Sequence, residues 1–292
     1  MKKRSRPFIG LAIGVATLTS SLLIFPVFAE PGEFELNGSL IWGMPAINVK
    51  YSNRFAPLYP SPPYTSSAGQ TLNIQGQGAL GLAVCLNYFP VPFLGFQVLG
   101  DYFKPSLGGR NSSYDLSLRY TYSLPPGSPP REATYQEAQE WGDTRGDLTQ
   151  VSFSFNGILR FRLGPLFRFS FSGGPSYYSV KGQASHFGYT KFSWGADGLL
   201  HILTYKLVGD FGPANGWGFN AGAGLALDLT RNIEIFMEFR YYRFSQVSLD
   251  IRIRPDDNIT EPMAEIENTM NLKPLAFDPS YYRIGLGFKV GI

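Results

Sequence analysis

Eleven charged residues of this chain sit at alternate positions in segments whose other alternate positions are mostly apolar. Six are cations and five are anions, and each residue type could serve in an ion pair, a gate or acid–base chemistry. The set is Glu35, Asp101, Arg160, Arg162, Arg168, Asp228, Glu234, Glu238, Arg240, Arg283 and Lys289. Charges held in a low-dielectric interior are costly unless they pair, so we expect these side chains to contact one another.

The segments that carry this set alternate apolar and polar residues one for one. Successive side chains of a β-strand point to opposite faces, so a period of two predicts strands with one apolar and one polar face. We expect eight such strands, of which the second is the clearest and the third the weakest. They are Glu33–Gly43, Thr71–Phe89, Phe93–Lys104, Asp147–Leu163, Leu166–Lys181, Trp217–Leu229, Asn232–Ser245 and Ser280–Ile292.

The gaps between these strands alternate between long and short. Three are short, at Pro90–Pro92, Gly164–Pro165 and Thr230–Arg231, and their residues suit tight turns. Four are long: Met44–Gln70, Pro105–Gly146, Gly182–Gly216 and Gln246–Pro279. Short turns on one side and long loops on the other are typical of outer-membrane barrels. The sequence therefore predicts an all-β fold, an eight-stranded antiparallel up-and-down transmembrane β-barrel with four long external loops and both termini in the periplasm.

Two of the long gaps contain alternating pieces of their own. One runs from Tyr114 to Tyr122 and the other from Val247 to Ile253. Either the strands continue above the membrane or the barrel has ten strands. Glu132–Trp141 is expected to form one or two turns of surface helix.

The first residues have the three parts of a secretory signal peptide. Four cations precede a largely apolar run from Phe8 to Phe25, and Val27-Phe28-Ala29 provides a cleavage site. We expect residues 1–29 to be the signal peptide and 30–292 the barrel domain, which Sec-dependent export delivers to the outer membrane of a Gram-negative-type cell. The net charge of +3 belongs to the leader, since the rest is close to −1. Net charge thus gives no support for nucleic acid as a partner.

In such a barrel the charged set points inward. Eight of its members lie near the periplasmic strand ends, all except Asp101, Arg240 and Arg283. The upper lumen is expected to be lined by Asn73, Gln75, Ser152, Ser154 and Asn220. Eight strands leave room for side chains or one small ligand, which favours an ion-pair plug over a gated pore. Cys85, the single cysteine, is expected to be a small buried filler.

Catalytic residues are sparse. Both histidines, His186 and His201, fall in the third expected external loop. Ser185 adjoins His186, but neighbouring strand residues point apart, so no nucleophile–base hydrogen bond is expected. His201 and Asp210 are close enough in sequence to meet in a folded loop. No spacing suggests zinc or calcium, and we expect no catalytic residue, no metal and no cofactor.

Aromatic residues cluster at the ends of the expected strands. The outer ends carry Trp42, Tyr102, Tyr177, Tyr178, Trp217, Tyr241 and Tyr282. The inner ends carry Phe89, Phe93, Phe161, Phe167 and Phe288. Two such clusters are expected at the two membrane interfaces of a barrel.

From Glu33 to Ile292 the chain resembles the small outer-membrane β-barrel family of the OmpA/OmpX, porin-like type. The resemblance rests on the alternating strands, on Gly218–Gly224 leading to Asp228 and a short turn, and on Tyr282–Phe288. The family usually ends in an aromatic residue that the barrel-assembly machinery reads, whereas this chain ends in Ile292. The resemblance implies outer-membrane lipid and that machinery as partners.

We therefore expect a non-enzymatic outer-membrane protein that stabilises the membrane or presents its loops, with a charged plug in the lumen. The first alternative is a small-solute pore, and the second is a barrel enzyme that acts on lipid or peptide. A soluble exported barrel with an apolar cavity comes last, because it would reverse the two faces of every strand.

Overall fold

The computed structural model describes residues 32–57, 64–122, 129–194, 200–230, 232–254, 259 and 262–291. The expected signal peptide, Arg231 and Ile292 lie outside these residues. Eight long strands pair in a closed antiparallel ring, in the order β1, β4, β5, β7, β8, β9, β10, β14 and back to β1. Their bounds are β1 Glu33–Pro45, β4 Ala79–Val91, β5 Leu94–Phe103, β7 Arg131–Leu163, β8 Phe167–Trp194, β9 Leu200–Asp228, β10 Ile233–Phe244 and β14 Tyr281–Gly291. The expected all-β antiparallel class is confirmed.

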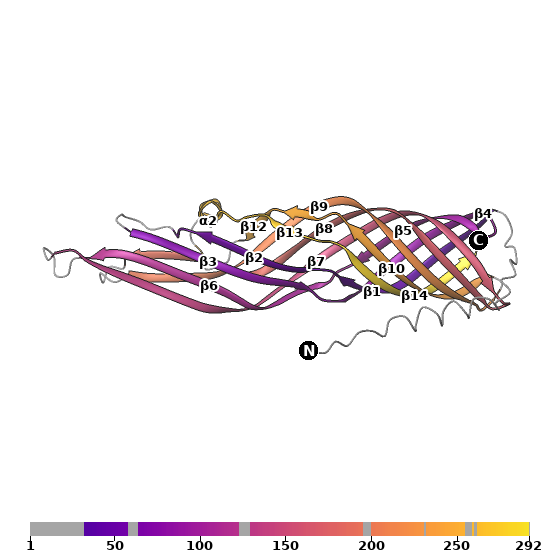
Figure 1. Ribbon diagram of the computed structural model, residues 1–292, viewed down its shortest axis with the longest axis horizontal. Helices are drawn as coiled ribbons and strands as arrows, with labels where there is room; N and C mark the ends of the chain where they lie inside the picture. Colours follow the sequence, from indigo (N-terminus) through magenta and orange to yellow (C-terminus); the bar gives the residue numbers. More distant parts are fainter. Residues whose placement is uncertain are drawn as a thin grey trace, which may run out of the picture.

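The chain continues beyond one end of the ring as a long sheet extension, on the left of Figure 1. The upper parts of β7, β8 and β9 run into it and are joined there by further elements. These are β2 Asn48–Phe55, β3 Tyr64–Gly76, β6 Ser106–Tyr122, β11 Val247–Leu249, β12 Ile251–Arg254, α2 Met263–Met270 and β13 Leu275–Phe277. The strand order on one side is β7-β6-β3-β2, and β12 pairs with β9 on the other.

The first three expected loops are thus largely β-sheet, and the fourth contains three short strands and α2, which corrects the sequence-based prediction. The alternating piece Tyr114–Tyr122 lies in β6, which pairs with β3 and β7 outside the ring. Ile251 and Ile253 lie in β12. Glu132–Trp141 was expected to be helical but is a strand, because it pairs residue by residue with β6. The one described helix, α2, falls in a segment for which no helix was expected.

The expected second strand, Thr71–Phe89, is divided between two places. Thr71–Gly76 belongs to β3, which pairs with β2 and β6, whereas β4 begins at Ala79 and pairs with β1. Gly78 lies against the Trp42 ring so closely that a Cβ atom there would be 2.8 Å from it. Leu72 and Ile74, expected to face outward, are buried in the extension, and Asn73 and Gln75 are more exposed than their neighbours there instead of lining the ring.

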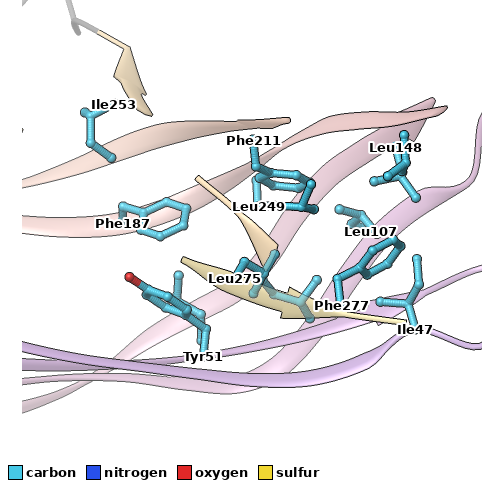
Figure 2. Close-up of a cluster of buried hydrophobic side chains, with 14 of the residues drawn as sticks. Ile47, Tyr51, Leu107, Leu148, Phe187, Phe211, Leu249, Ile253, Leu275 and Phe277 are labelled. Atoms are coloured by element: carbon cyan, nitrogen blue, oxygen red, sulfur yellow. The ribbon is translucent and has the colours of Figure 1, made fainter. Parts of the chain in front are cut away.

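The extension has an apolar core. Figure 2 shows aromatic and aliphatic side chains from its strands converging on β11 and β13. The labelled members are Ile47, Tyr51, Leu107, Leu148, Phe187, Phe211, Leu249, Ile253, Leu275 and Phe277, all at most 5% exposed. Burial of this apolar surface stabilises a sheet that has water on its outer side.

The segment that carries α2 joins the two edge strands of the extension. Asn53 on β2 donates to the Met270 carbonyl oxygen at 2.7 Å, and the Ile253 amide of β12 donates to Glu267 Oε1 at 2.9 Å. Ile266 and Met270 are fully buried beneath the helix. The helix thus covers the core where β2 and β12 leave a seam.

Candidate functional site

The interior of the ring holds one cluster of charges near the end that carries the short turns. It surrounds Glu35, which is 1% exposed. Its carboxylate pairs with Arg160 and lies 3.8 Å from Arg168 Nη1 and 3.5 Å from Lys289 Nζ. Asn87 donates to Glu35 Oε2 at 3.0 Å. One buried carboxylate is therefore surrounded by three cations and an amide.

The same cluster neutralises those cations with two more carboxylates. Glu234 lies 2.7 Å from Arg168 and 3.2 Å from Lys289. Asp228 lies 2.7 Å from Arg162 and 3.1 Å from Arg168. Register explains the meeting: Arg162 faces Arg168 across the β7–β8 hairpin, and Asp228 faces Glu234 across the β9–β10 hairpin. Two like-charged pairs thus stand on neighbouring hairpins and offset each other.

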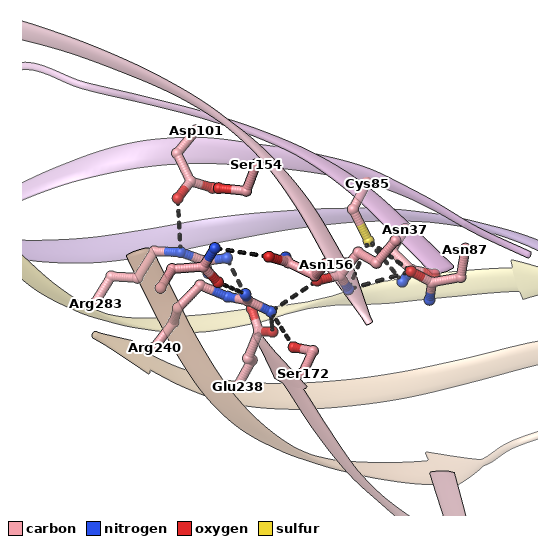
Figure 3. A network of polar contacts seen from close by, with 12 residues as sticks. Asn37, Cys85, Asn87, Asp101, Ser154, Asn156, Ser172, Glu238, Arg240 and Arg283 are labelled. Atoms are coloured by element: carbon pink, nitrogen blue, oxygen red, sulfur yellow. Dashed lines mark hydrogen bonds and ion pairs between the residues drawn. The ribbon is translucent and has the colours of Figure 1, made fainter. Parts of the chain in front are cut away.

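A second cluster of charges lies in the ring nearer the end from which the extension continues (Figure 3). The Arg283 guanidinium donates to Asp101 Oδ2 at 3.0 Å and to Glu238 Oε2 at 2.7 Å. Arg240 also pairs with Glu238, and both arginine side chains are fully buried. Glu238 was expected near the periplasmic strand ends, but it belongs to this group because its neighbour across β14 is Gly285, which leaves space toward Arg283.

Amide side chains connect the two clusters. Arg240 donates to Gln97 Oε1 at 2.8 Å, and Gln97 donates to Asn87 Oδ1 at 3.1 Å. Since Asn87 also donates to Glu35, a hydrogen-bonded path runs from one cluster to the other. Asn156 and Asn220 extend the network sideways, and both are among the buried polar residues. Such a network fixes the rotamers of its members, since each hydrogen bond of the path joins a defined donor to a defined acceptor.

Two tyrosines that the sequence analysis did not single out close the top of this network. Tyr242 and Tyr281 both donate to Asp101, and their rings stack with centroids 4.4 Å apart. Tyr281 also bonds Ser152 at 2.9 Å. Alternation could have identified both, because each is the sequence neighbour of an outward-facing tyrosine, Tyr241 or Tyr282, and therefore points inward.

All eleven predicted charged residues thus lie inside the ring and each makes at least one ion pair. One further carboxylate was missed: Glu33 Oε2 lies 2.9 Å from Arg160 Nη2. Its parity matches that of Glu35, two residues on. With Glu33 included, six cations face six anions, so the described interior carries no net charge.

Little space remains between these side chains. One cavity of about 30 Å³ is lined by Asn37, Cys85, Glu238, Arg283 and Lys289, among others. Asn37 Oδ1 and Arg283 Nη1 are buried there without a hydrogen-bond partner in the protein. The volume and the polar lining suit about one water molecule. Cys85 is buried and accepts from Asn37 at 3.0 Å, in keeping with a filler.

The two aromatic clusters need one correction each. Tyr178 and Phe89 were expected to face outward, but both are fully buried. The Arg160 guanidinium lies over the Phe89 ring, with its Cζ atom 3.7 Å from the ring centroid, and Tyr178 packs on Phe244. Their parity is that of the inward residues of their strands, and this parity outweighs their position at the strand ends.

The histidines lie in strands of the extension, and one expectation about them is wrong. Ser185 Oγ lies 2.7 Å from His186 Nδ1, although adjacent strand residues were expected to point apart. The β8–β9 register shifts between Ser185 and Phe187, and His186 has a φ of 77°. This irregularity turns the imidazole toward its neighbour. His201 and Asp210 both lie in β9, nine residues apart, which separates them by about 30 Å.

Burial lowers the pKa of His186, and the neighbouring cations Lys206 and Arg145 lower it further, while Asp143 opposes them. The imidazole is therefore neutral over a wider pH range and can accept the Ser185 proton at Nδ1. Within the described residues no group of three His, Cys, Asp or Glu side chains is placed to hold a metal ion. The described helix is too short and too polar to cross a membrane.

No known family model matches the chain, and no curated protein matches it. Several solved structures are similar in shape at low sequence identity. The outer membrane protein OprG from Pseudomonas aeruginosa has a TM-score of 0.47 and 10% identity, over 90% of this chain and 97% of that one. Ail of Yersinia pestis, in complex with the heparin analogue sucrose octasulfate, has a TM-score of 0.35 and 12% identity, over 90% and 100%.

A third similar structure is the outer membrane protease OmpT from Escherichia coli. Its TM-score is 0.32 with 10% identity, over 91% of this chain and 98% of that one. All three are outer-membrane β-barrel proteins. Similarity at this level assigns neither a family nor an activity.

Proposed function

We propose that this chain is an outer-membrane β-barrel protein whose ring spans the bilayer, whose interior is closed by the charged plug, and whose sheet extension stands outside the cell. One observation carries the proposal: the ring is apolar outside and charged inside. Leu40, Leu80 and Phe219 are 63%, 68% and 70% exposed, whereas Arg240 and Arg283 are fully buried. In water this arrangement would be inverted, and lipid is the solvent that it suits.

The height of the apolar surface supports the same conclusion. On β1 it runs from Phe34 to Trp42, and on β9 and the residue that follows it from Trp217 to Leu229. With a rise of about 3.4 Å per residue and a tilt of about 40°, these spans are about 20 and 30 Å tall. The apolar band of a bacterial outer-membrane barrel is about 25 Å tall.

Aromatic side chains mark the upper edge of this band. Exposed members at that edge are Trp42, Tyr102, Trp217, Tyr241 and Tyr282. Tyrosine and tryptophan favour membrane interfaces because one part of the ring is apolar and another part is polar. The short turns then lie on the periplasmic side, and outer-membrane lipid is the surrounding partner. Export through the Sec pathway and insertion by the barrel-assembly machinery complete the proposal.

The closed interior favours a structural, sheet-presenting role over a pore. The amide path between the charge clusters crosses the ring. The described interior carries equal numbers of cations and anions, so no excess of either sign is present to select ions. We expect folded protein, verified by its gel mobility, to show no single-channel conductance in planar bilayers above the background leak of the bilayer. Sustained conductance would favour the pore and reject the plug.

The membrane location has its own test. Cells that produce the protein are fractionated, and the outer-membrane fraction is run in SDS with and without heating. We expect a band in that fraction which migrates faster before heating, because a closed ring resists SDS. A soluble periplasmic protein without a mobility shift would contradict the proposal.

A hydrolase is the second candidate, and the Ser185–His186 hydrogen bond is the observation that favours it. A serine bonded to a neutral imidazole is the first requirement of nucleophilic catalysis. Ser185 also accepts from the Arg145 amide at 3.1 Å, which holds the hydroxyl in place. We expect no labelling of folded protein by a fluorophosphonate probe. Labelling that is lost in Ser185→Ala would replace the non-enzymatic role with an enzymatic one.

A further inference from the structure

A polar hollow lies on the outer face of the extension, where three neighbouring strands are irregular. Its wall is formed by β3, β6 and β7, and its volume is about 910 Å³. The lining includes Asn73, Gln77, Arg110, Asp143 and Arg145. The alternation of β3 places Asn73 and Gln75 opposite the apolar core, because Leu72 and Ile74 on the same strand are buried. Arg110, Asp143 and Arg145 on β6 and β7 are exposed.

The hollow arises from a break in the strand ladders. The β3–β6 register shifts between Thr71 and Gln75, and the β6–β7 register shifts between Gly109 and Ser112. Arg110 and Asn111 consequently have no register partner in either neighbouring strand, and Asn111 has a φ of 59°. Their carbonyl groups accept from Asn73 Nδ2, at 2.7 and 3.1 Å, which turns these two carbonyls toward the β3 side. Bulges of this kind re-aim side chains and expose backbone groups.

The charges of the hollow favour an anion. Arg110 and Arg145 are both exposed, and neither guanidinium is in an ion pair among the described residues. Asp143 is the one carboxylate of the lining, so the hollow has an excess of one positive charge. Gln77 Nε2 would lie 2.9 Å from a Cβ atom at Gly108, and because both residues line the hollow it adds an amide donor. A pair of guanidinium groups with amide donors is a common receptor for phosphate oxygens.

The height of the hollow narrows the choice of ligand. Its lower end adjoins the top of the apolar band, since Gln77 is followed by Gly78, which lies against Trp42. Arg145 faces Gly108. Gly108 is six residues above Tyr102, or about 15 Å along the membrane normal. Phospholipid headgroups extend only about 5–7 Å beyond the hydrocarbon. A headgroup that spans the whole height of the hollow is therefore larger than that of a phospholipid, and the uncharged amide and hydroxyl side chains of the lining, such as Gln75, Gln77 and Ser106, suit the hydroxyl groups of a sugar.

We propose that this hollow binds the phosphate of a phosphorylated sugar, and that in the membrane this sugar phosphate belongs to the headgroup of a surrounding glycolipid. The lipid part rests on the proposed membrane location, whereas binding of the soluble sugar phosphate does not. Asp143 acts against the ligand and limits its affinity.

The first experiment measures binding of N-acetylglucosamine 1-phosphate to the full-length protein in neutral detergent, with N-acetylglucosamine as the uncharged probe. We expect the sugar phosphate to bind and the uncharged sugar not to bind. Binding of the sugar phosphate should be about tenfold weaker in Arg110→Gln/Arg145→Gln, because each lost guanidinium removes a charge-assisted hydrogen bond. Asp143→Asn should tighten binding by about threefold. The matched control, Arg54→Gln/Arg252→Gln, removes two exposed arginines outside the hollow and should change binding less than twofold.

Two results would overturn the site. One is the absence of binding by the wild-type protein, and the other is an equal loss in the two double variants, which would indicate general charge attraction. The lipid part is tested in phosphatidylcholine nanodiscs with and without a tenth of a diphosphorylated glucosamine-disaccharide lipid. We expect the protein to retain this lipid through purification unless Arg110 and Arg145 are replaced. Binding of the soluble phosphate without retention of the lipid would reject the glycolipid, and the gel-mobility test separates that result from failure of the membrane location.

Discussion

The ring and the extension bury opposite kinds of side chain, polar in the ring and apolar in the extension. On β1, in the ring, Leu40 is 63% exposed and Glu35 is 1% exposed. On β2, in the extension, Tyr51 and Phe55 are buried and Lys50 and Arg54 are exposed. The chain reverses its polarity within the few residues between the two strands. One alternating pattern therefore serves two environments, and under the proposed membrane location the level of reversal marks the boundary between lipid and water.

The two regions are also held together differently. The ring interior depends on pairing, because each of its charges would be costly alone. The extension depends on packing, since its interior is aromatic and aliphatic. Substitutions of matched chemistry in the two regions should therefore have unequal effects.

The largest effect is expected from Arg283→Met in the ring. This change leaves Asp101 and Glu238 with reduced compensation in a buried site and should lower the free energy of unfolding by about 3–5 kcal/mol. The matched change in the extension is Arg254→Met, whose partner Asp210 is exposed, and it should cost less than about 1 kcal/mol. Urea titration followed by heat-dependent gel mobility measures both. Equal losses would mean that the ring does not depend on its buried pairs.

The next effect is expected from Phe187→Ala in the extension. Phe187 is fully buried and its ring packs against Tyr51, with centroids 5.7 Å apart. The cavity should cost about 3 kcal/mol and act locally. Amide hydrogen exchange should accelerate in β2, β8 and β9 above the ring and stay unchanged in β14. Phe155→Ala, on the apolar outside of the ring, is the control, and faster exchange throughout both regions would refute local action.

A smaller effect should separate the two outer faces. Leu40→Arg places a charge on the apolar band, near its upper edge, and should cost about 1 kcal/mol in lipid. Ser52→Arg places the same side chain on the exposed face of β2 and should change stability by less than about 0.5 kcal/mol. Reversible unfolding from lipid bilayers measures the difference. Similar values for the two variants would place the outer face of the ring in water.

The smallest effect concerns pH. The pKa of His186 is lowered in the folded protein from its usual value of 6.5. Below that value the unfolded chain binds a proton that the folded chain resists, so the stability of the extension is complete above about pH 6.5 and declines as the pH falls further. Hydrogen exchange at about pH 7.5 and about pH 5.5 should show faster opening of β8 at the lower pH, with no change in the ring.

The histidine variants provide the controls for that measurement. His186→Gln should flatten the response of β8, and His201→Gln should leave it as it is. A response that survives His186→Gln would assign the pH dependence to another group.

Much of the interior site follows from parity. All eleven charged residues were identified from alternation, and Glu33, Tyr242 and Tyr281 share the parity of residues that were. The Ser185–His186 contact was not predictable in this way, because it depends on a register shift that local sequence does not mark. The hollow at Arg110 has the same origin, since it forms where two ladders slip against each other.

Local sequence was sufficient to predict most strands of the ring, the tight turns between them and the set of charges that share one face, although it joined parts of β3 and β4 into one strand. It was sufficient because alternation, turn residues and charge are local properties that each segment carries alone. Only the folded sheet shows that the buried face changes from polar in the ring to apolar in the extension, since a period of two distinguishes two faces without saying which of them is buried. Tertiary structure also turned the expected loops into sheet, because strands such as β6 and β7 become strands only when each finds the other.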